Sequence, residues 1–220
     1  KQYAHTKEGK NYLNLVSLLT PIVKSWCTDQ SVYITSLGVQ IHGGMGFIED
    51  TGAAQYYRDC RILPIYEGTN GIQALDLLRR KLFQENGTTF HRVVNMINET
   101  INKSRALKDK ELRDIDKLLS QSLDDLEQCC LWLKKTFIEN PEKAASGATP
   151  FMNMFGWILG GWVMLNSALK AKLNIKKNPD HHFSKEKIIT AIFYCKTYLP
   201  IASSFKSTIM NSYYSLKSFN

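Results

Sequence analysis

Apolar residues recur along most of this chain at steps of three and four positions, the spacing of one face of an α-helix. These steps predict a helix over 11–19 and a longer one from Pro21 to about residue 42. Thr20 and Pro21 divide the two, because threonine favours the cap of a helix and proline its first position. No segment alternates convincingly at the strand period, so the pattern predicts an all-α protein.

Glycines and prolines divide the first part of the chain further. The Gly43-Gly44 pair is expected to end the long helix, since glycine accepts the left-handed geometry of a helix end. A polar helical run over about 50–61 follows, and Pro64 breaks it. Thr69 or Asn70 then caps another helix.

Asn86-Gly87 is the predicted domain boundary, which gives one domain over 1–86 and a second helical bundle over 88–220. Beyond the boundary the helical period strengthens, and residues 140–150 are interpreted as a loop. The predicted helices are one at about 90–101, one over 110–139, one starting at Thr149-Pro150, and a pair over 184–199 and 201–216 divided by Pro200. The helix over 110–139 carries a bundle seam of Leu112, Ile115, Leu119, Leu126, Cys130, Leu133 and Phe137.

Residues 144–169 contain no charged side chain, and 151–169 hold a Gly156-xxx-Gly160 step. Such a segment is nearly long enough to span a membrane, and its glycines could pair with another helix. Asn153 and Asn166 lie within it, and the neighbouring helices are amphipathic and need an apolar partner. We therefore expect a buried central helix of a soluble bundle and no transmembrane segment.

The net charge of +8 raises the question of a nucleic-acid partner. Lys and Arg less Asp and Glu give 14 − 10 = +4 for residues 1–110 and 14 − 10 = +4 for residues 111–220. No half is especially basic, and no Arg-rich stripe alternates with aromatic residues, which argues against nucleic-acid binding. An acidic partner or an anionic ligand stays open.

The five cysteines, at 27, 60, 129, 130 and 195, form no Cys-x-x-Cys pair. They are interpreted as reduced and mostly buried thiols of a cytoplasmic protein. His181-His182 has no companion ligands at metal spacing, so no metal site is expected. The chain begins at Lys1 without a methionine or signal peptide, and it is interpreted as a fragment or a processed chain.

Glu67 is a lone carboxylate in an apolar and glycine-rich stretch, with Ile62–Tyr66 before it and Gly68–Ile72 after it. Removing water from a carboxylate makes it a stronger base, and a sharp turn aims it away from the scaffold. Glu67 is therefore a candidate general base, although a solvated glutamate on a glycine-closed turn fits the same pattern. Backbone N–H groups at the following helix start could polarise a substrate carbonyl or hold a phosphate oxygen.

Three motifs carry a family resemblance: Gln40-Ile-His-Gly-Gly-Met-Gly-Phe, Tyr57-Arg-Asp-Cys-Arg-Ile-Leu-Pro-Ile-Tyr-Glu-Gly-Thr and Ile72-Gln73. Residues 11–85 resemble the C-terminal helical domain of the acyl-CoA dehydrogenases. Residues 88–220 resemble the extra helical domain of a bacterial subgroup, which includes enzymes of long-chain and methylthio-propionyl thioesters. The resemblance implies α,β-dehydrogenation of an acyl-CoA thioester to the 2-enoyl-CoA, with FAD, in fatty-acid β-oxidation.

The resemblance also implies a role for each motif residue. Glu67 would remove the α-proton while the β-hydrogen leaves as hydride to N5 of FAD, and Tyr66 and Gly68 would contact the substrate. The thioester oxygen would accept hydrogen bonds from the Glu67 backbone N–H and a flavin ribityl hydroxyl. The implied cofactor contacts are Gln40, Ile41, His42, Gly43 and Gly44 on the FAD of a neighbouring subunit, and Thr69, Asn70 and Gly71 on the chain's own FAD. Many relatives carry Gln or Glu in place of Gly71, which offers only its backbone.

The family's N-terminal helical domain and middle β-domain have no counterpart in these residues. We therefore interpret the chain as the C-terminal portion of a homo-oligomeric enzyme (a dimer or larger) whose electron acceptor is electron-transfer flavoprotein. By itself this portion is not expected to retain FAD or to oxidise acyl-CoA. The alternative is a non-catalytic helical interaction module that kept the motif, and the upstream coding sequence would distinguish the two.

Overall fold

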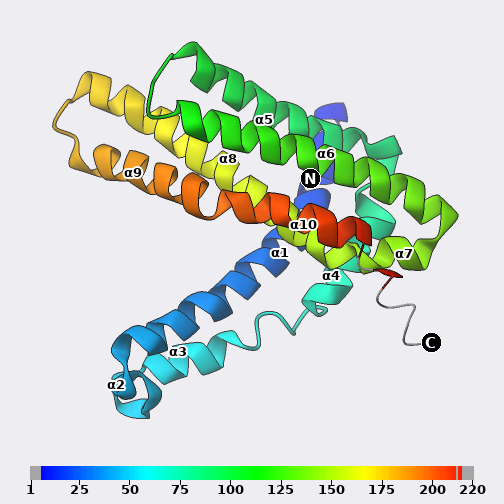
Figure 1. The fold of residues 1–220 in the computed structure, drawn as a ribbon, viewed down its shortest axis with the longest axis horizontal. Helices are drawn as coiled ribbons and strands as arrows, with labels where there is room; N and C mark the ends of the chain where they lie inside the picture. The colour runs from blue at the N-terminus through cyan, green and yellow to red at the C-terminus, as the bar shows by residue number, and fades with distance from the viewer. Residues whose placement is uncertain (1–5, 212, 215–220) are drawn as a thin grey trace. The chain divides into compact units, whose positions relative to one another are not determined.

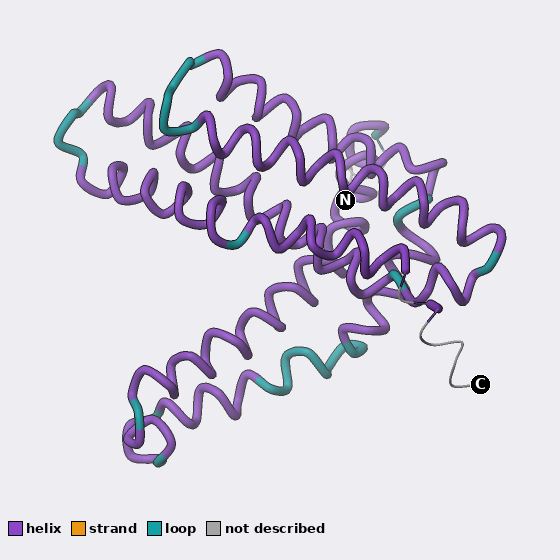
Figure 2. Tube along the Cα trace, viewed as in Figure 1, coloured by secondary structure: helices purple, strands orange, loops and turns teal. Residues whose placement is uncertain are grey.

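The computed structural model describes residues 6–211 and 213–214, and these form helices joined by turns, with no β-strand among them (Figure 2). The all-α prediction is confirmed. The chain divides into two compact units, Lys1–Lys81 and Leu82–Asn220. The domain limits 1–86 and 88–220 remain a prediction from the sequence.

The first unit is built around one long helix, α1, against which α3 and α4 pack (Figure 1). The short helix α2 lies at the turn where the chain leaves α1 and returns along it as α3. The elements are α1 Lys7–His42, α2 Gly44–Phe47, a 3-10 turn Glu49–Thr51, α3 Ala53–Cys60, α4 Asn70–Asp76 and a π-helical turn Leu77–Lys81.

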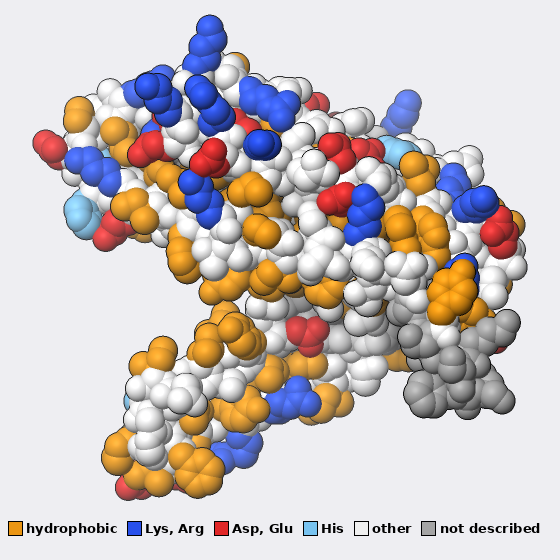
Figure 3. Space-filling view, viewed as in Figure 1, with side chains coloured by type: hydrophobic (Ala, Val, Ile, Leu, Met, Phe, Trp, Pro, Cys, Tyr) orange, Lys and Arg blue, Asp and Glu red, His pale blue; other side chains and the backbone are white. Residues whose placement is uncertain are grey.

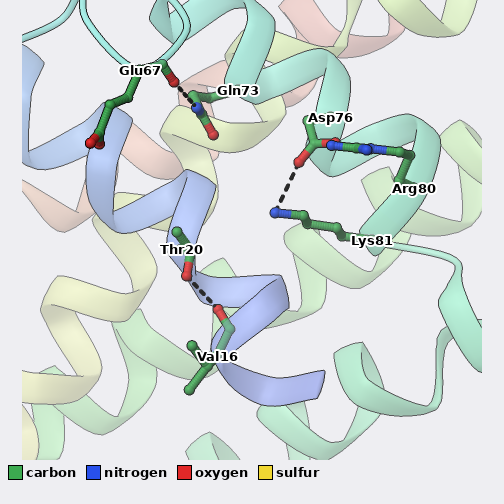
Figure 4. A network of polar contacts seen from close by, with 7 residues as sticks. All are labelled: Val16, Thr20, Glu67, Gln73, Asp76, Arg80 and Lys81. Carbon is green, nitrogen blue, oxygen red and sulfur yellow. Dashed lines mark hydrogen bonds and ion pairs between the residues drawn. The ribbon is translucent and has the colours of Figure 1, made fainter. Parts of the chain in front are cut away.

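The predicted break at Thr20-Pro21 is wrong, because α1 runs without interruption through Pro21. A proline within a helix removes one backbone hydrogen bond and crowds the carbonyl four residues earlier, but favourable tertiary packing can override such a local preference. Pro21 and its neighbours Leu18 and Ile22 are buried. The hydroxyl of Thr20 donates to the Val16 carbonyl at 2.7 Å, so threonine bonds back along the helix instead of capping a new one (Figure 4).

The predicted end of the long helix at Gly43 is confirmed. Gly43 has φ 62°, and its N–H donates to the Gln40 carbonyl at 3.1 Å. The following turn is so tight that a Cβ at Gly46 would lie 2.3 Å from the Val39 carbonyl oxygen. Glycine is therefore required at 43 by backbone conformation and at 46 by space.

The second unit is a bundle in which α8 contacts α5, α6, α9 and α10 (Figure 1). Most of the predicted seam on α6 is buried, from Leu112 just before the helix to Leu133. The elements are a 3-10 turn Gln84–Gly87, α5 Thr88–Ala106, α6 Arg113–Glu139, α7 Pro141–Ser146, α8 Ala148–Lys177, α9 His182–Thr197 and α10 Leu199–Asn211.

Two expectations for this unit need correction. Residues 140–150 are not a loop, because they contain α7 and the start of α8. The Asn140 side chain caps α7 by accepting from the Lys143 N–H at 2.9 Å, and Pro141 occupies the first position. The last two helices are divided at Tyr198, and Pro200 is tolerated within the first turn of α10. The predicted end at residue 216 lies outside the described residues.

The uncharged segment 151–169 lies within α8, and the prediction of a buried central helix is confirmed. Phe151, Met152, Phe155, Ile158 and Leu165 are each at most 1% exposed.

By length and composition alone, one helical run among the described residues could cross a membrane, namely His182–Asn211. That run comprises α9 and α10, which pack on α8 in the bundle. A helix that covers the core of a bundle can have the same composition, so the run by itself is weak support for a membrane span.

Large apolar side chains are exposed over the surface of α1, α2 and α3 (Figure 3). Ile41 is 83% exposed and Phe47 82%. Others on the same three helices are Tyr33, Ile34, Met45 and Tyr56. Apolar surface of this extent is typical of a face that contacts another protein surface.

Candidate functional site

The turn that carries Glu67 has an unusual backbone. Glu67 and Gly68 have φ of 57° and 85°, so two consecutive residues are left-handed. This conformation costs roughly 1–2 kcal/mol at a residue with a Cβ, such as Glu67. The turn is closed by a hydrogen bond of 3.1 Å from the Asn70 N–H to the Pro64 carbonyl. Thr69 is the N-cap of α4, as expected, although its side chain makes no capping hydrogen bond.

Side chains bind both carbonyl groups of this left-handed pair. The Gln73 amide donates to the Glu67 carbonyl at 2.8 Å (Figure 4). The Lys24 ammonium, from α1, donates to the Gly68 carbonyl at 3.0 Å. The residues next to Glu67 in the sequence are uncharged, but folding brings the Lys24 ammonium to the turn.

Asn70 joins the turn to α1 through its side-chain amide. Its oxygen accepts from the Lys24 ammonium at 2.8 Å, and its nitrogen donates to the Asp29 carboxylate at 2.7 Å. The amide nitrogen also lies 3.1 Å from the Ser25 carbonyl and 3.0 Å from the Thr28 hydroxyl. Since the amide oxygen meets a cation and the amide nitrogen an anion, the charges on α1 favour this orientation of the amide.

The carboxylate of Glu67 is exposed, and Figure 4 shows it directed away from the Gln73 amide. It makes no hydrogen bond or ion pair with the residues that the structure describes. Asp76, on α4, contrasts with it. Burial opposes ionisation of Asp76, but hydrogen bonds from Arg80 and Lys81 hold its pKa below the usual range (Figure 4). Asp29 and Asp76 are both engaged, so of these three carboxylates Glu67 is the one without a partner among the described residues.

The backbone N–H groups of Glu67, Gly68 and Thr69 make no hydrogen bond within the described part of the chain. Three consecutive free donors next to an exposed carboxylate can receive an oxygen of a bound molecule. Tyr66 lies beside them, 46% exposed, with the Lys24 ammonium 5.9 Å from the centre of its ring.

The second group of predicted site residues lies apart from the first. Gln40, Ile41, His42, Gly43 and Gly44 are all exposed at the C-terminal end of α1. The His42 ring contacts the Gly38 carbonyl at 2.8 Å. The stretch from Lys24 to His42 covers about 27 Å of helix, at ~1.5 Å per residue. The structure therefore does not bring the two groups together within one chain.

Lys24 and the amide of Gln73 are site residues that reasoning from the sequence alone missed. A signal was present, because Lys24, Ser25, Thr28 and Asp29 fall on one stripe of α1 at helical spacing. A polar stripe on one helix predicts a polar partner, but it does not say which later segment supplies it.

The remaining polar groups point to structural roles. Cys60, Cys129, Cys130 and Cys195 are buried and free, as predicted, and Cys27 is exposed. His181 accepts a hydrogen bond from the Ser184 N–H at 3.2 Å at the start of α9. Within residues 6–211 and 213–214, no group of three or more His, Cys, Asp or Glu side chains could hold a metal ion.

Comparison with known families matches both parts of the chain. The family described as "Acyl-CoA dehydrogenase, C-terminal domain" matches residues 4–82. The family described as "Acetyl-CoA dehydrogenase C-terminal like" matches residues 93–218.

Individual relatives agree with these matches. The chain is 39% identical over 202 residues to 3-methylmercaptopropionyl-CoA dehydrogenase of Ruegeria pomeroyi, covering 90% of this chain and 34% of that protein. It is 25% identical over 217 residues to the broad-specificity linear acyl-CoA dehydrogenase FadE5 of Mycobacterium tuberculosis, covering 94% of this chain and 35% of that protein. The chain thus spans about a third of the length of these relatives.

Among solved structures, the fold is similar to that of Caenorhabditis elegans ACDH-11 in complex with C11-CoA. The TM-score is 0.68 at 24% sequence identity, over 86% of this chain and 30% of that one. This similarity supports the order and packing of the helices.

Proposed function

The chain belongs to the acyl-CoA dehydrogenase family, and from that membership we propose that it is the C-terminal portion of a flavin-dependent acyl-CoA dehydrogenase with Glu67 as catalytic base. The observation that carries the proposal is the turn itself. It combines a carboxylate and adjacent N–H groups that are unpaired among the described residues with a backbone whose two carbonyls are bound by the side chains of Gln73 and Lys24.

In this proposal Glu67 takes the α-proton of a saturated acyl-CoA thioester. Its backbone N–H donates to the thioester oxygen and stabilises the negative charge that develops there as the proton leaves. A bound FAD would supply the hydride acceptor for the β-hydrogen, and the product would be the 2-enoyl thioester. Tyr66 and Gly68 lie on either side of Glu67 and would contact the substrate.

The residues proposed to hold FAD fit parts of an extended ligand. The exposed helix end Gln40–Gly44 would meet the adenosine-diphosphate portion of an FAD on a neighbouring subunit, and Thr69–Gly71 would meet the chain's own FAD. The separation of the two groups along α1 supports two different cofactors. The Asn70 side chain is occupied by α1, so this segment would offer the cofactor backbone groups and the Thr69 hydroxyl.

Further partners follow from the same proposal. The names of the relatives, a 3-methylmercaptopropionyl-CoA dehydrogenase and a broad-specificity linear acyl-CoA dehydrogenase, support an acyl-CoA thioester as substrate. The apolar surface on α1–α3 supports a homo-oligomer. We also propose electron-transfer flavoprotein as electron acceptor, a role in fatty-acid β-oxidation, a cytoplasmic location and no transmembrane segment.

The test is Glu67→Gln in the full-length protein. Flavin reduction by acyl-CoA in stopped flow should slow by several orders of magnitude while FAD stays bound, since the amide keeps the shape but cannot take the proton. Glu8→Gln, an exposed glutamate in the first turn of α1, is the matched control and should leave the rate unchanged. Reduction of the Glu67→Gln protein within about tenfold of wild type would contradict the proposal and favour a non-catalytic helical module.

A further inference from the structure

We propose that Lys24 is a positioning residue, which fixes the turn of Glu67 through the neighbouring Gly68 carbonyl and so directs the carboxylate. The inference rests on the proposed function of Glu67 and adds a residue outside the three motifs that carry the family resemblance. Lys24 lies on α1, 44 positions before Gly68 in sequence, and its ammonium binds the Gly68 carbonyl.

The turn needs such support because the left-handed backbone conformation of Glu67 is energetically unfavourable. Glu67 has a Cβ and a φ of 57°, and an exposed residue in this left-handed conformation tends to relax unless surrounding contacts determine it. Lys24 and Gln73 supply those contacts, one on each of the two consecutive carbonyls. A hydrogen bond from an ammonium is about twice as strong as a neutral one, so Lys24 should be the more important of the two.

Lys24 is itself held in place. Its ammonium also binds the Asn70 amide oxygen at 2.8 Å, and the amide nitrogen of Asn70 is bound to Asp29 at 2.7 Å. Lys24, Asn70 and Asp29 thus form a chain of alternating donors and acceptors, which returns to α1 at both ends. This arrangement ties the start of α4 and the Gly68 carbonyl to the same rigid helix.

The expected consequence concerns catalysis more than binding. A base displaced by about 1 Å can lose roughly a hundredfold in rate, whereas most of a CoA thioester lies far from this carboxylate. In the full-length enzyme, Lys24→Met should therefore lower kcat by about 30- to 100-fold and change KM by less than about threefold. Lys24→Arg should restore most of kcat, because a guanidinium can reach both oxygens that the ammonium binds.

A second readout is independent of activity. The Asn70 N–H, which closes the turn on Pro64, should exchange with deuterium at least about tenfold faster in Lys24→Met when followed by mass spectrometry. Lys10→Met is the matched control, since Lys10 is an exposed lysine of the same helix whose side chain makes no hydrogen bond or ion pair with the described residues. It should alter neither exchange nor kcat.

The outcomes separate the two proposals. If Glu67→Gln abolishes turnover while Lys24→Met keeps kcat within about twofold, the proposed function stands and the positioning role is wrong. Unchanged exchange at Asn70, or no rescue by Lys24→Arg, would also overturn the positioning role. If Glu67→Gln remains active, the proposed function fails and the catalytic role of Lys24 fails with it.

Discussion

The packing of α8 against α9 predicts the effect of Gly160→Ala. A Cβ at Gly160 would lie 2.1 Å from the Tyr194 hydroxyl oxygen and 2.8 Å from the ring carbon that bears it. An aromatic ring cannot bend away from such a contact, so the whole Tyr194 side chain must move. Its hydroxyl donates to the Trp157 carbonyl at 3.0 Å, and this bond would break.

Three contributions set the expected change in the free energy of unfolding of Gly160→Ala. Overpacking of this kind costs about 1–3 kcal/mol, and loss of the hydrogen bond costs about 0.5–1.5 kcal/mol. Alanine regains about 1 kcal/mol over glycine within a helix. The net expectation is a destabilisation of about 2 kcal/mol, whereas most Gly→Ala changes within helices stabilise.

The measurement is urea unfolding of the 220-residue chain, followed by circular dichroism and by tryptophan fluorescence. Gly38→Ala, in α1, is the control, because a Cβ there meets nothing within 4 Å. It should stabilise its unit by up to about 1 kcal/mol. Tyr194→Phe removes the hydroxyl that the added Cβ of Gly160→Ala would meet, so the double mutant should be at least about 1 kcal/mol more stable than the sum of the two single effects predicts in a double-mutant cycle. An unfolding free energy of Gly160→Ala within about 0.5 kcal/mol of wild type, or above it, would refute the reasoning.

Two further predictions concern thiols and the cofactor. Iodoacetamide at pH 8 should label the native chain at Cys27 alone and should label all five cysteines in urea. The reason is that burial raises the pKa of Cys129 to about 11 and the pKa of Cys130 and Cys195 to about 12. Rapid labelling of Cys130 in the native chain would contradict its burial. The 220-residue chain should not retain FAD, because each of its two candidate segments would contact only part of the cofactor, whereas tight sites bury most of a ligand's surface. Micromolar FAD binding by calorimetry, or a stoichiometric 450 nm flavin band, would contradict this prediction.

Much of the fold follows from local sequence. The seam of α6 is buried where the three-and-four spacing places it, as at Leu119 and Leu126. The end of α1 at Gly43 follows from a conformation that glycine adopts most easily. Both features depend on residues within a few positions of each other, which is why one sequence suffices to predict them.

Two wrong predictions show where tertiary packing or a neighbouring signal overrides a rule based on local sequence. Thr20-Pro21 has the pattern of a helix start, yet α1 continues, with Pro21 buried, because tertiary packing overrides the local cost of a proline within a helix. Asn140-Pro141 has the same kind of pattern and does start a helix, α7, within residues that composition assigns to a loop. The two pairs differ in tertiary context, which a rule based on neighbouring residues does not contain.

The candidate base itself was found from sequence, because a lone carboxylate in an apolar, glycine-rich turn is a local pattern. The sequence alone also determined the all-α class and the family motifs. Only the tertiary structure decided what holds that turn. The bond between Lys24 and Gly68 joins residues 44 positions apart, and the Asn70 bonds span 41 to 46. Such bonds depend on how α4 packs on α1, and helical periodicity predicts which face packs but not which polar atoms then meet.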